Sequence, residues 1–323
     1  MSSPVEIVSV NVSREKGTCK QPVAEITIDA QGVRGDAHAG PWHRQVSLLS
    51  EESIQRFARE TGREVRPGDF AENITLRGIE MTKVAVLDRF CFPCVAGVPP
   101  ATDGKVELEV TQLGKKCHGQ GCAIFQQVGK CVMPSEGVFA RVVSGGTLRP
   151  GDGGLHLPRT LRALIVTLSD RAAAGQYADR SGPRIRELLE TFLADRRWQA
   201  STENVLIPDD AAQLRQRLVA AIASGADVIF TTGGTGIGAR DITPETVAAL
   251  CDKLLPGIME HIRVKFGAEH PAALLSRSVA GVAGRTQLYA LPGSVRAVEE
   301  YLSEILKSLE HAVFMLRGVD VHG

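Results

Sequence analysis

The sequence predicts two domains of different fold class. The first is a mainly β, barrel-like domain over residues 1–157, and the second is an α/β three-layer domain with a mostly parallel sheet over residues 158–323. A chain of 323 residues is long enough for about two domains. The first part has short β-branched runs separated by turn residues, whereas the second alternates apolar, strand-length runs with helical segments. Six of the seven cysteines precede residue 158: Cys19, Cys91, Cys94, Cys117, Cys122 and Cys131.

Charge and hydropathy exclude several classes of protein. The chain has 37 basic and 37 acidic residues, 18 of each before residue 158 and 19 of each after it. A nucleic-acid-binding protein needs a basic surplus, so we expect no nucleic-acid partner. The longest apolar stretches are strand-sized, and the first residues form neither a basic start nor an apolar leader. These features predict a cytoplasmic protein with no membrane partner.

The first domain is expected to contain six strands and one helix. The helix runs from Glu51 to about Glu60, with Ser50 as its N-cap. Turn-forming residues 144–154 predict the end of this domain, followed by a linker to about Pro158. The expected strands are Glu6–Val12, Val23–Asp29, Gln45–Leu49, Val84–Leu87, Val106–Thr111 and Val138–Val143.

The second domain is expected to alternate strands and helices around a sheet covered on both faces. In such sheets, ligands bind beyond the carboxyl ends of the strands. The expected strands are Leu161–Thr167, Asn204–Ile207, Asp227–Thr232 and Gln287–Leu291. The expected helices are Gly182–Ala194, Ala211–Ser224, Glu245–Leu250 and a C-terminal helix from about Val295.

A glycine-rich segment, residues 233–238, follows one of these strands. Glycine lets backbone N–H groups approach an anion, and Thr231, Thr232 and Thr235 add hydroxyl donors. The segment has neither the Gly-Lys-Ser/Thr of a Walker loop nor the spacing of a dinucleotide fingerprint. Phosphate binding is one interpretation, and a tight strand-to-helix turn is the other.

Two acidic residues favour phosphate binding. Asp209 follows one strand, and Asp241 lies between the glycine segment and a helix with Pro244 near its first turn. Mg²⁺ binds through one or two carboxylates together with substrate phosphates, so these two residues are candidate magnesium ligands. The alternative is that both are helix caps, a role that Asp210 could also fill.

Polar residues follow the other strands as well. Ser169 and Asp170 come after the first strand, and Pro292, Gly293 and Ser294 come before the last helix. The N-terminus of that helix is a candidate anion site, although Ser294 could serve only as its N-cap. Ser276 and Arg277 offer a further hydroxyl and a further cation.

These segments together resemble the molybdopterin adenylyltransferase family, from about Leu161 to the C-terminus. The resemblance implies that AMP is transferred from Mg-ATP to the terminal phosphate of molybdopterin, with release of pyrophosphate, before molybdate is inserted. The family's two essential acids fall on Asp209 and Asp241. The resemblance also implies a homo-oligomer, with a trimer favoured, and a molybdate-inserting enzyme as partner. The implied ligand-binding residues are Ser169, Asp170, Thr232, Gly233, Gly234, Thr235, Gly236, Ser276, Arg277, Pro292, Gly293 and Ser294.

The residue types suit this chemistry. Attack of one phosphate on another brings two anions together, so positioning and charge neutralisation must supply most of the catalysis. Mg²⁺ held by Asp241 and the nucleotide phosphates would neutralise charge, and Asp209 would help to place the metal or the attacking phosphate. Neither acid needs to carry a proton.

In the first domain, Cys117 follows a strand and two lysines, Lys115 and Lys116. Neighbouring lysines favour the thiolate, the form that attacks or binds metals. An ordinary surface thiol beside solvated lysines is the alternative.

The first domain resembles the MOSC domain, named for the C-terminal domain of molybdenum cofactor sulfurase, from about Glu6 to Asp152. The resemblance is carried by residues 32–38, 42–48, 68–74 and 137–142, and it places the family's characteristic cysteine at Cys117. It implies a β-rich barrel that binds molybdopterin or the molybdenum cofactor, with Cys117 as a molybdenum ligand or a sulfur carrier. Arg44, Asn73 and Arg141 would contact the pterin phosphate.

Other interpretations remain open. Cys91 and Cys94 have metal-ligand spacing and could form a zinc site with Cys117, His118 and Cys122. The alternative is that Cys91, Cys94 and Cys131 are buried and unreactive. At the level of function, two alternatives stand beside a bifunctional protein of molybdenum cofactor biosynthesis. One is a molybdenum-dependent reductase of N-hydroxylated compounds in the first domain, and the other is a non-catalytic molybdopterin carrier.

Overall fold

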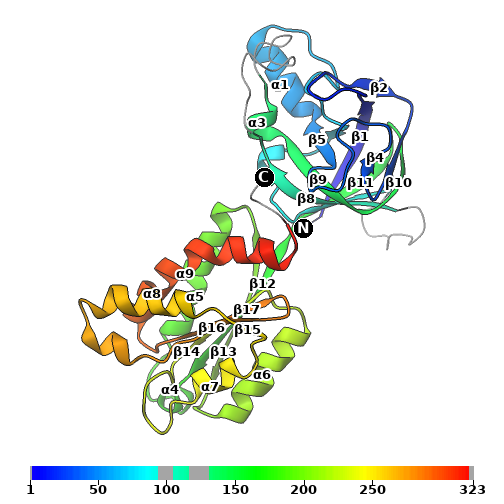
Figure 1. Cartoon of the computed structure of the whole chain (residues 1–323). Helices are drawn as coiled ribbons and strands as arrows, with labels where there is room; N and C mark the ends of the chain where they lie inside the picture. Colours follow the sequence, from blue (N-terminus) through cyan, green and yellow to red (C-terminus); the bar gives the residue numbers. More distant parts are fainter. Residues whose placement is uncertain (1, 94–104, 116–130, 320–323) are drawn as a thin grey trace. The chain divides into compact units, whose positions relative to one another are not determined.

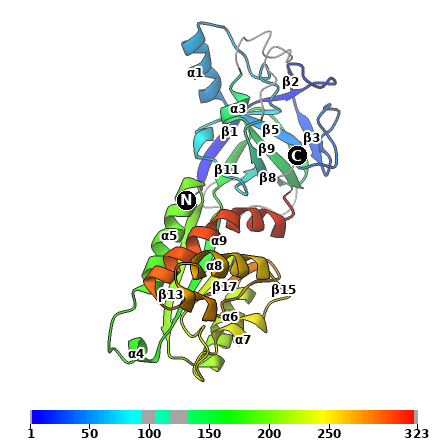
Figure 2. The same ribbon diagram turned by 60° about the vertical axis from the view of Figure 1, so that its left-hand side comes forward.

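The computed structural model describes residues 2–93, 105–115 and 131–319 of the chain. The chain divides into two compact units, Met1–Arg159 and Thr160–Gly323, shown in Figures 1 and 2. Among the described residues, no helix has both the length and the apolar character needed to cross a bilayer.

The first unit is a closed β-barrel of seven strands. Strand β1 pairs with β6 on one side and with β11 on the other, which closes the ring. All neighbours are antiparallel except β5 and β6, which are parallel. In order around the ring the strands are β1 (Ser3–Val12), β11 (Gly153–Leu157), β7 (Arg89–Phe92), β8 (Val106–Leu113), β9 (Val138–Ser144), β5 (Val46–Ser50) and β6 (Ile74–Arg77).

Smaller elements surround the barrel. Strand β2 (Gln21–Val23) extends the sheet from β1, and three short strands form a separate sheet: β10 (Gly146–Leu148), β3 (Ile26–Asp29) and β4 (Gly32–Val33). The helical segments are α1 (Glu51–Thr61), η1 (Met81–Lys83) and α3 (Met133–Glu136).

The inward-facing side chains of the strands fill the barrel. Ile7, Leu48 and Leu108 belong to one buried cluster of apolar residues, as the alternating pattern of strands predicts. Helix α1 begins after Ser50, whose Oγ accepts a hydrogen bond from the Ser53 N–H at 3.1 Å, so the predicted cap is confirmed. Phe57 of this helix packs edge to face on Phe70, with the ring centroids 5.1 Å apart.

Three expectations for the first unit were wrong. Residues 84–87 are not a strand, because Leu87 has φ = 73° and the Asp88 carboxylate closes a turn by accepting the Ala85 N–H at 2.8 Å. The strand expected over residues 23–29 is divided between β2 and β3. The stretch expected to be turns and linker, residues 144–158, contains β10 and β11, which complete the sheets. Gly154 permits this closure, since a Cβ there would overlap the Phe92 ring.

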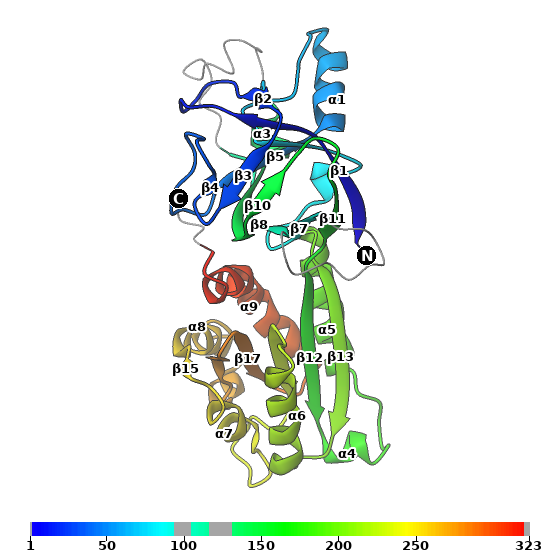
Figure 3. The same ribbon diagram turned by 90° about the vertical axis from the view of Figure 1, so that its right-hand side faces the viewer.

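The second unit has a six-stranded sheet between two layers of helices. Strands β13, β12, β14 and β17 are parallel neighbours, and β12 and β13 lie side by side in Figure 3. The last two strands, β16 and β15, pair antiparallel with their neighbours, and β15 is at the edge. The bounds are β12 (Thr160–Leu168), β13 (Gln199–Ile207), β14 (Val228–Thr232), β15 (Lys253–Leu254), β16 (Ala280–Ala283) and β17 (Thr286–Leu291).

Helices cover both faces of this sheet (Figure 1). Helices α5, α8 and α9 lie on one face, and α6 and α7 lie on the other. Their bounds, with the two short helical segments, are α4 (Asp170–Ala173), α5 (Ser181–Asp195), α6 (Ala211–Ala223), α7 (Thr243–Ala248), α8 (Pro256–Gly267), η3 (Pro271–Leu275) and α9 (Val295–Leu316). The buried positions of α9 recur every three or four residues, as expected for a helix with one face on a core.

Sequence reasoning missed helix α8 and the two antiparallel strands β15 and β16. A tight turn at Gly284, which has φ = 56°, connects β16 to β17. The Asp252 carboxylate accepts the Gly284 N–H at 2.6 Å. The polar and charged residues of α8 hide a short apolar face, of which Met259 and Ile262 are buried. The strands that carry the candidate site are unaffected by these omissions.

Candidate functional site

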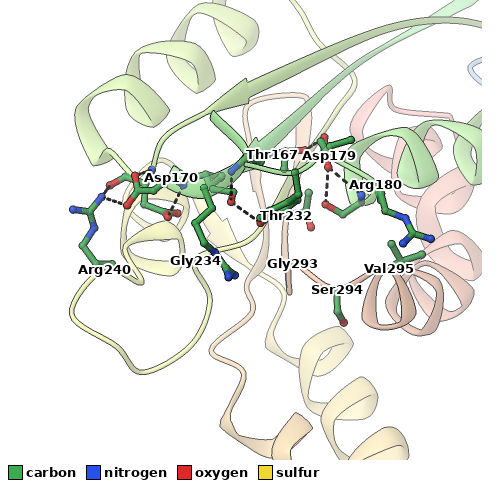
Figure 4. Close-up of a pocket in the computed structure, with 18 of the residues that line it drawn as sticks. Thr167, Asp170, Asp179, Arg180, Thr232, Gly234, Arg240, Gly293, Ser294 and Val295 are labelled. Carbon is green, nitrogen blue, oxygen red and sulfur yellow. Dashed lines mark hydrogen bonds and ion pairs between the residues drawn. The ribbon is translucent and has the colours of Figure 1, made fainter. Parts of the chain in front are cut away.

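The carboxyl ends of four parallel strands lie at the same edge of the second unit's sheet. The strand registers align Leu168 with Ile207 and Thr232 with Leu291, so the residues that follow each strand come together. A cavity of about 670 Å³ lies there (Figure 4). Eight residues predicted for the site line it: Ser169, Asp170, Asp209, Thr232, Gly234, Asp241, Gly293 and Ser294.

Asp170 and Asp209 hold each other in place. The Asp209 carboxylate accepts a hydrogen bond from the Asp170 N–H at 3.2 Å, and the Asp170 carboxylate accepts one from the Asp209 N–H at 3.0 Å. Asp209 is therefore not the cap of α6. That role belongs to Asp210, whose Oδ1 accepts the Gln213 N–H at 2.8 Å.

Asp241 is held by the loop that precedes it. Its Oδ2 accepts the Gly238 N–H at 2.7 Å, and its own N–H donates to the Gly238 carbonyl at 3.0 Å. A Cβ on Gly236 would lie 2.7 Å from this Oδ2, so glycine is needed for the close approach. The N-cap of α7 is Ile242, without a side-chain cap, so Asp241 is not a helix cap either.

The acidic side of the cavity fits a hard cation that is also held by a substrate. Asp209 and Asp241 each retain one carboxylate oxygen, Oδ1, without a hydrogen-bond donor among the described residues. Within the same part of the chain, no three acidic, histidine or cysteine side chains form a complete metal site. Mg²⁺ needs only one or two protein carboxylates when phosphates supply further oxygens.

The glycine turn brings the backbone against the cavity. Gly233 has φ = 102°, and a Cβ there would overlap the Leu168 carbonyl oxygen. Thr243 fixes the turn, since its Oγ1 donates to the Gly233 carbonyl at 2.9 Å. Thr232 Oγ1 donates to the Pro292 carbonyl at 2.8 Å and so joins this turn to the one after β17.

Several predicted residues support the cavity without lining it: Gly233, Thr235, Gly236, Ser276, Arg277 and Pro292. Arg277 donates to the Gly236 carbonyl at 2.6 Å and to the Asp241 carbonyl at 2.8 Å, and it forms an ion pair with Glu245. We therefore place Arg277 as a support of the glycine loop. Ser276 shares a hydrogen bond of 2.7 Å with the Ser278 hydroxyl.

Sequence reasoning missed further lining residues, of which Arg171, Arg180, Arg240 and Asp179 carry charge. Asp179 accepts a hydrogen bond from the Thr167 hydroxyl at 2.7 Å and others from the first residues of α5. In Figure 4, Arg240 and Asp170 lie at one end of the cavity and Arg180, Ser294 and Val295 at the other. Each of these residues follows a strand, or precedes a helix, that also carries a predicted site residue, and this position is the signal that could have identified them.

The two ends of the cavity thus differ in charge. At one end Asp170 and Asp209 lie together, and Arg240 pairs with Asp170. At the other are Arg180, Asp179 and the N-terminus of α9, a 22-residue helix. Ser294 caps that helix by accepting the Ala297 N–H at 3.2 Å. Such a cavity can hold a cation at one end and an anion at the other.

The first unit has a smaller cavity of about 250 Å³. Its lining includes Arg44 and Asn73, which were predicted, and also His38, Trp42 and Lys115. The Arg44 guanidinium lies 4.8 Å from the centre of the Trp42 ring, and its buried Nε has no hydrogen-bond acceptor in the described structure. Asn73 is fully buried, and its Oδ1 accepts from the Ser47 hydroxyl at 3.0 Å.

Arg141 does not line this cavity. Its guanidinium donates to Glu109 at 2.6 Å, and the same carboxylate also pairs with Arg89. The structure therefore brings together two of the three residues predicted to contact a pterin phosphate and places the third elsewhere on the barrel.

Buried charges lie beside the cavity. Lys20 is 1% exposed, and it contacts Asp36 and lies 3.4 Å from Nδ1 of His38. Burial lowers the pKa of Lys20. Burial alone would raise the pKa of Asp36, but hydrogen bonds from His38 and Lys20 outweigh it and hold that pKa below its usual range. Burial raises the pKa of Glu72 to about 7, although a hydrogen bond from the Gly68 N–H acts to lower it.

The predicted cysteine site falls largely outside the described residues. Cys117, together with Cys94, His118 and Cys122 of the proposed zinc set, lies in residues 94–104 and 116–130. Cys91, on β7, is in a disulfide, whereas Cys251 is a free thiol. Cys91 is buried, as the alternative to a zinc site expected, and its sulfur is not available as a zinc thiolate because it is in a disulfide.

Comparison with known proteins identifies both units. The model of the MOSC domain matches residues 35–153, and the model described as a probable molybdopterin binding domain matches residues 164–311. A molybdopterin adenylyltransferase of Helicobacter pylori is 31% identical over 161 residues, which are 50% of this chain and 90% of that protein.

Two further relatives match the second unit. A molybdenum cofactor biosynthesis bifunctional protein of Synechococcus elongatus is 40% identical over 161 residues. That match covers 50% of this chain and 49% of the relative, so the chain spans about half of the relative's length. The crystal structure of the tungsten cofactor synthesizing protein MoaB from Pyrococcus furiosus is 36% identical, with a TM-score of 0.43, and the match covers 50% of this chain and 98% of that structure.

Proposed function

The chain belongs to the molybdopterin adenylyltransferase family through its second domain and carries a MOSC domain before it, and from this premise we propose that the second domain transfers AMP from ATP to molybdopterin. Its place is in molybdenum cofactor biosynthesis. The observation that carries the proposal is the pair Asp209 and Asp241 in one cavity with the glycine turn.

In the proposed reaction, a phosphate oxygen of molybdopterin attacks the α-phosphorus of ATP. A new phosphorus–oxygen bond forms, the bond to the β-phosphate oxygen breaks, and pyrophosphate leaves. Asp209 and Asp241 would hold Mg²⁺, which would neutralise the charge of the reacting phosphates when bound. Gly234 and the N-terminus of α9 would receive phosphate oxygens, and no side chain needs to carry a proton.

The experiment is incubation of the full chain with molybdopterin, Mg²⁺ and ATP labelled on the α-phosphate. We expect labelled adenylyl-molybdopterin from the wild type and from Cys117→Ala, and none above background from Asp241→Asn. Asp209→Asn and Asp210→Asn form a matched pair, because the two residues are adjacent but Asp210 caps α6. Loss of product in Asp209→Asn alone would support the assignment.

Failure of folded wild type to form product would contradict the transferase. Molybdopterin binding without product would then favour the non-catalytic carrier. Equal activity of Asp209→Asn and wild type would remove Asp209 from the magnesium site.

For the first domain, we propose that the 250 Å³ cavity binds molybdopterin or the molybdenum cofactor. The observation that favours this is a basic lining, Arg44 and Lys115, beside the ring of Trp42. Cys117 would act there as a molybdenum ligand or a sulfur carrier. If the domain is instead a reductase of N-hydroxylated compounds, the purified protein should contain molybdenum and should also reduce such a compound when an electron donor is supplied, so metal analysis together with this assay separates the two.

Binding to the first domain can be followed by Trp42 fluorescence in a Trp198→Phe background, because the chain has only these two tryptophans. Molybdopterin should quench Trp42, and Arg44→Gln should weaken binding about tenfold, as loss of a charged hydrogen bond predicts. Arg141→Gln is the matched control, since Arg141 lies outside the cavity. Equal weakening in both variants would contradict the assignment.

We also propose that the chain forms a homo-oligomer, with a trimer favoured, and passes its product to a molybdate-inserting enzyme. Exposed apolar side chains on neighbouring elements support the first point, since Val264 is 73% exposed and Leu274 and Leu275 are more than half exposed. Light scattering after size-exclusion chromatography tests it, and a monomer at micromolar concentration would contradict it.

A further inference from the structure

Arg240 occupies the acidic end of the cavity. Its guanidinium forms an ion pair with Oδ2 of Asp170, and the same nitrogen lies 3.5 Å from the carbonyl oxygen of Asp209 (Figure 4). The other oxygen of Asp170, Oδ1, already accepts the Asp209 N–H. Arg240 therefore covers the one Asp170 oxygen that is not used inside the protein.

This ion pair can open at little energetic expense. The side chains of Arg240 and Asp170 are 68% and 44% exposed, and an exposed ion pair contributes only about 0–1 kcal/mol. Asp241, the next residue, is fixed separately by the Gly238 N–H and by Arg277. The Arg240 side chain can therefore turn away without moving the Asp241 carboxylate.

A divalent cation and the guanidinium would oppose each other at this end. If Asp209 and Asp241 hold a cation, Arg240 is a like charge beside it, because it lies close to the Asp209 carbonyl and pairs with the adjacent Asp170, and the two positive charges repel each other. A guanidinium released from a carboxylate finds an equivalent planar partner in a phosphate group.

We propose that Arg240 exchanges partners during the reaction cycle: it neutralises Asp170 in the cation-free cavity and moves to a phosphate of the nucleotide when the cation binds. The inference rests on the proposed function of the cavity. It makes Arg240 a positioning residue that holds the acidic end in place before the substrate arrives and then holds the substrate.

The exchange predicts opposite effects on two affinities. In the full chain, Arg240→Gln should bind Mn²⁺ alone about three- to tenfold more tightly than wild type, because its competitor is gone. In saturating Mn²⁺, the same variant should bind a non-hydrolysable ATP analogue about tenfold more weakly, because a phosphate contact is lost. Calorimetry measures both, and neither titration requires adenylyl transfer.

Arg171→Gln is the matched control, because Arg171 lines the same cavity but lies over the Tyr177 ring, 5.4 Å from its centre, and not on a carboxylate. Its Mn²⁺ affinity should equal that of wild type. Arg240→Lys, which keeps the charge, should leave Mn²⁺ affinity close to wild type and guards against a folding defect in Arg240→Gln.

Unchanged or weaker Mn²⁺ binding by Arg240→Gln would contradict the proposed competition between the Arg240 guanidinium and the cation. The absence of Mn²⁺ binding by both the variant and wild type would contradict it as well. Unchanged nucleotide affinity would overturn the movement to phosphate. Opposite shifts in a protein that forms no adenylyl-molybdopterin would support the exchange and contradict the transferase, so the two proposals fail separately.

Discussion

Asp170 and Asp209 each accept a hydrogen bond from the other's backbone N–H, at 3.0 and 3.2 Å. The two residues follow neighbouring parallel strands, and their reciprocal bonds tie the ends of β12 and β13 together. Each carboxylate is thereby oriented by a backbone group. The second oxygen of Asp209 has no hydrogen-bond donor among the described residues, whereas the second oxygen of Asp170 pairs with Arg240. The orientation of Asp209 therefore depends on Asp170.

Removal of the Asp170 side chain should disturb Asp209. In Asp170→Ala, the Asp209 N–H loses its acceptor, and we expect the rate of adenylyl transfer to fall about 10–100-fold. Asp170→Asn keeps an acceptor oxygen but not the charge, so it should recover part of the loss. Single-turnover rates at saturating ATP measure both variants. Equal rates for the alanine and asparagine variants would contradict a positioning role through this hydrogen bond.

A methyl group on Gly236 should displace Asp241. Gly236 does not have a positive φ, so alanine suits its backbone, but the new Cβ would lie 2.7 Å from Asp241 Oδ2. We expect Gly236→Ala to lower activity at least tenfold, with a change in unfolding free energy below about 1 kcal/mol. Gly257→Ala, at a position with open space around it, is the control and should leave activity unchanged.

Arg277 should be required for the shape of the glycine loop. Its guanidinium donates to two carbonyl groups and pairs with Glu245, a geometry that the single ammonium of lysine cannot reproduce. We expect Arg277→Lys to destabilise the second domain by about 1–2 kcal/mol and to increase amide hydrogen exchange over residues 236–241. Lost activity with unchanged exchange would instead indicate direct contact with a ligand.

Local signals were sufficient to predict much of the fold. Ser50, Asp210 and Ser294 were expected as helix caps, and each accepts the N–H three residues ahead. A cap depends on neighbours within one turn, so it can be read from sequence. The continuous apolar runs that became β12 and β14 were equally local signals.

Two of the errors concern contacts between distant segments. Strand β11 closes the barrel by pairing with β1, about 150 residues earlier, and no local pattern distinguishes it from a glycine-rich linker. Likewise, Arg277 donates hydrogen bonds to carbonyl groups of the glycine loop 36 and 41 residues earlier in the chain. Because these partners are distant in sequence, its position suggested a contact with the ligand instead. Long-range pairing decided both cases.

Glu304 should make the second domain sensitive to acid. A hydrogen bond from Lys265, then one from Lys307, lowers the pKa of Glu304 to about 2. A lowered pKa in the folded state adds stability above the unfolded value of about 4.5, and this is lost as pH falls from there toward 2. Between pH 5 and pH 2.5, the unfolding free energy of Glu304→Gln should fall by about 1–2 kcal/mol less than that of wild type. This difference should be smaller at high salt.

Trp198 reports this transition, because it packs on Phe314 of α9 with ring centroids 5.8 Å apart. Urea unfolding followed by Trp198 fluorescence in a Trp42→Phe background gives the free energy of the second domain. Glu299→Gln, on the same helix, is the control. Parallel acid profiles for wild type and Glu304→Gln would contradict the prediction.

Glu72 should give the first domain the opposite pH dependence. Burial raises the pKa of its carboxyl group to about 7. Its Oε1 accepts the Gly68 N–H at 2.6 Å and the Thr75 hydroxyl at 2.9 Å, whereas the buried Oε2 has no partner within the described part of the chain. A pKa raised on folding adds stability that is complete below about pH 4.5 and is lost as pH rises through 7. The loss by pH 8 is at most about 3 kcal/mol.

Glu72→Gln keeps an acceptor for both donors and removes the titration, so its stability should vary less with pH. At pH 5 the variant should be about 1 kcal/mol less stable than wild type, because the new amide N–H₂ is buried without an acceptor. At pH 8 it should be more stable, because wild type must then bury a charge. Urea unfolding at pH 5, 6.5 and 8, followed by Trp42 fluorescence in a Trp198→Phe background, measures the pH at which the variant becomes more stable than wild type. Glu64→Gln, at a position whose side chain is 79% exposed, should follow wild type throughout. A constant difference between Glu72→Gln and wild type at all three pH values would show that the Glu72 carboxyl group does not change protonation in this range.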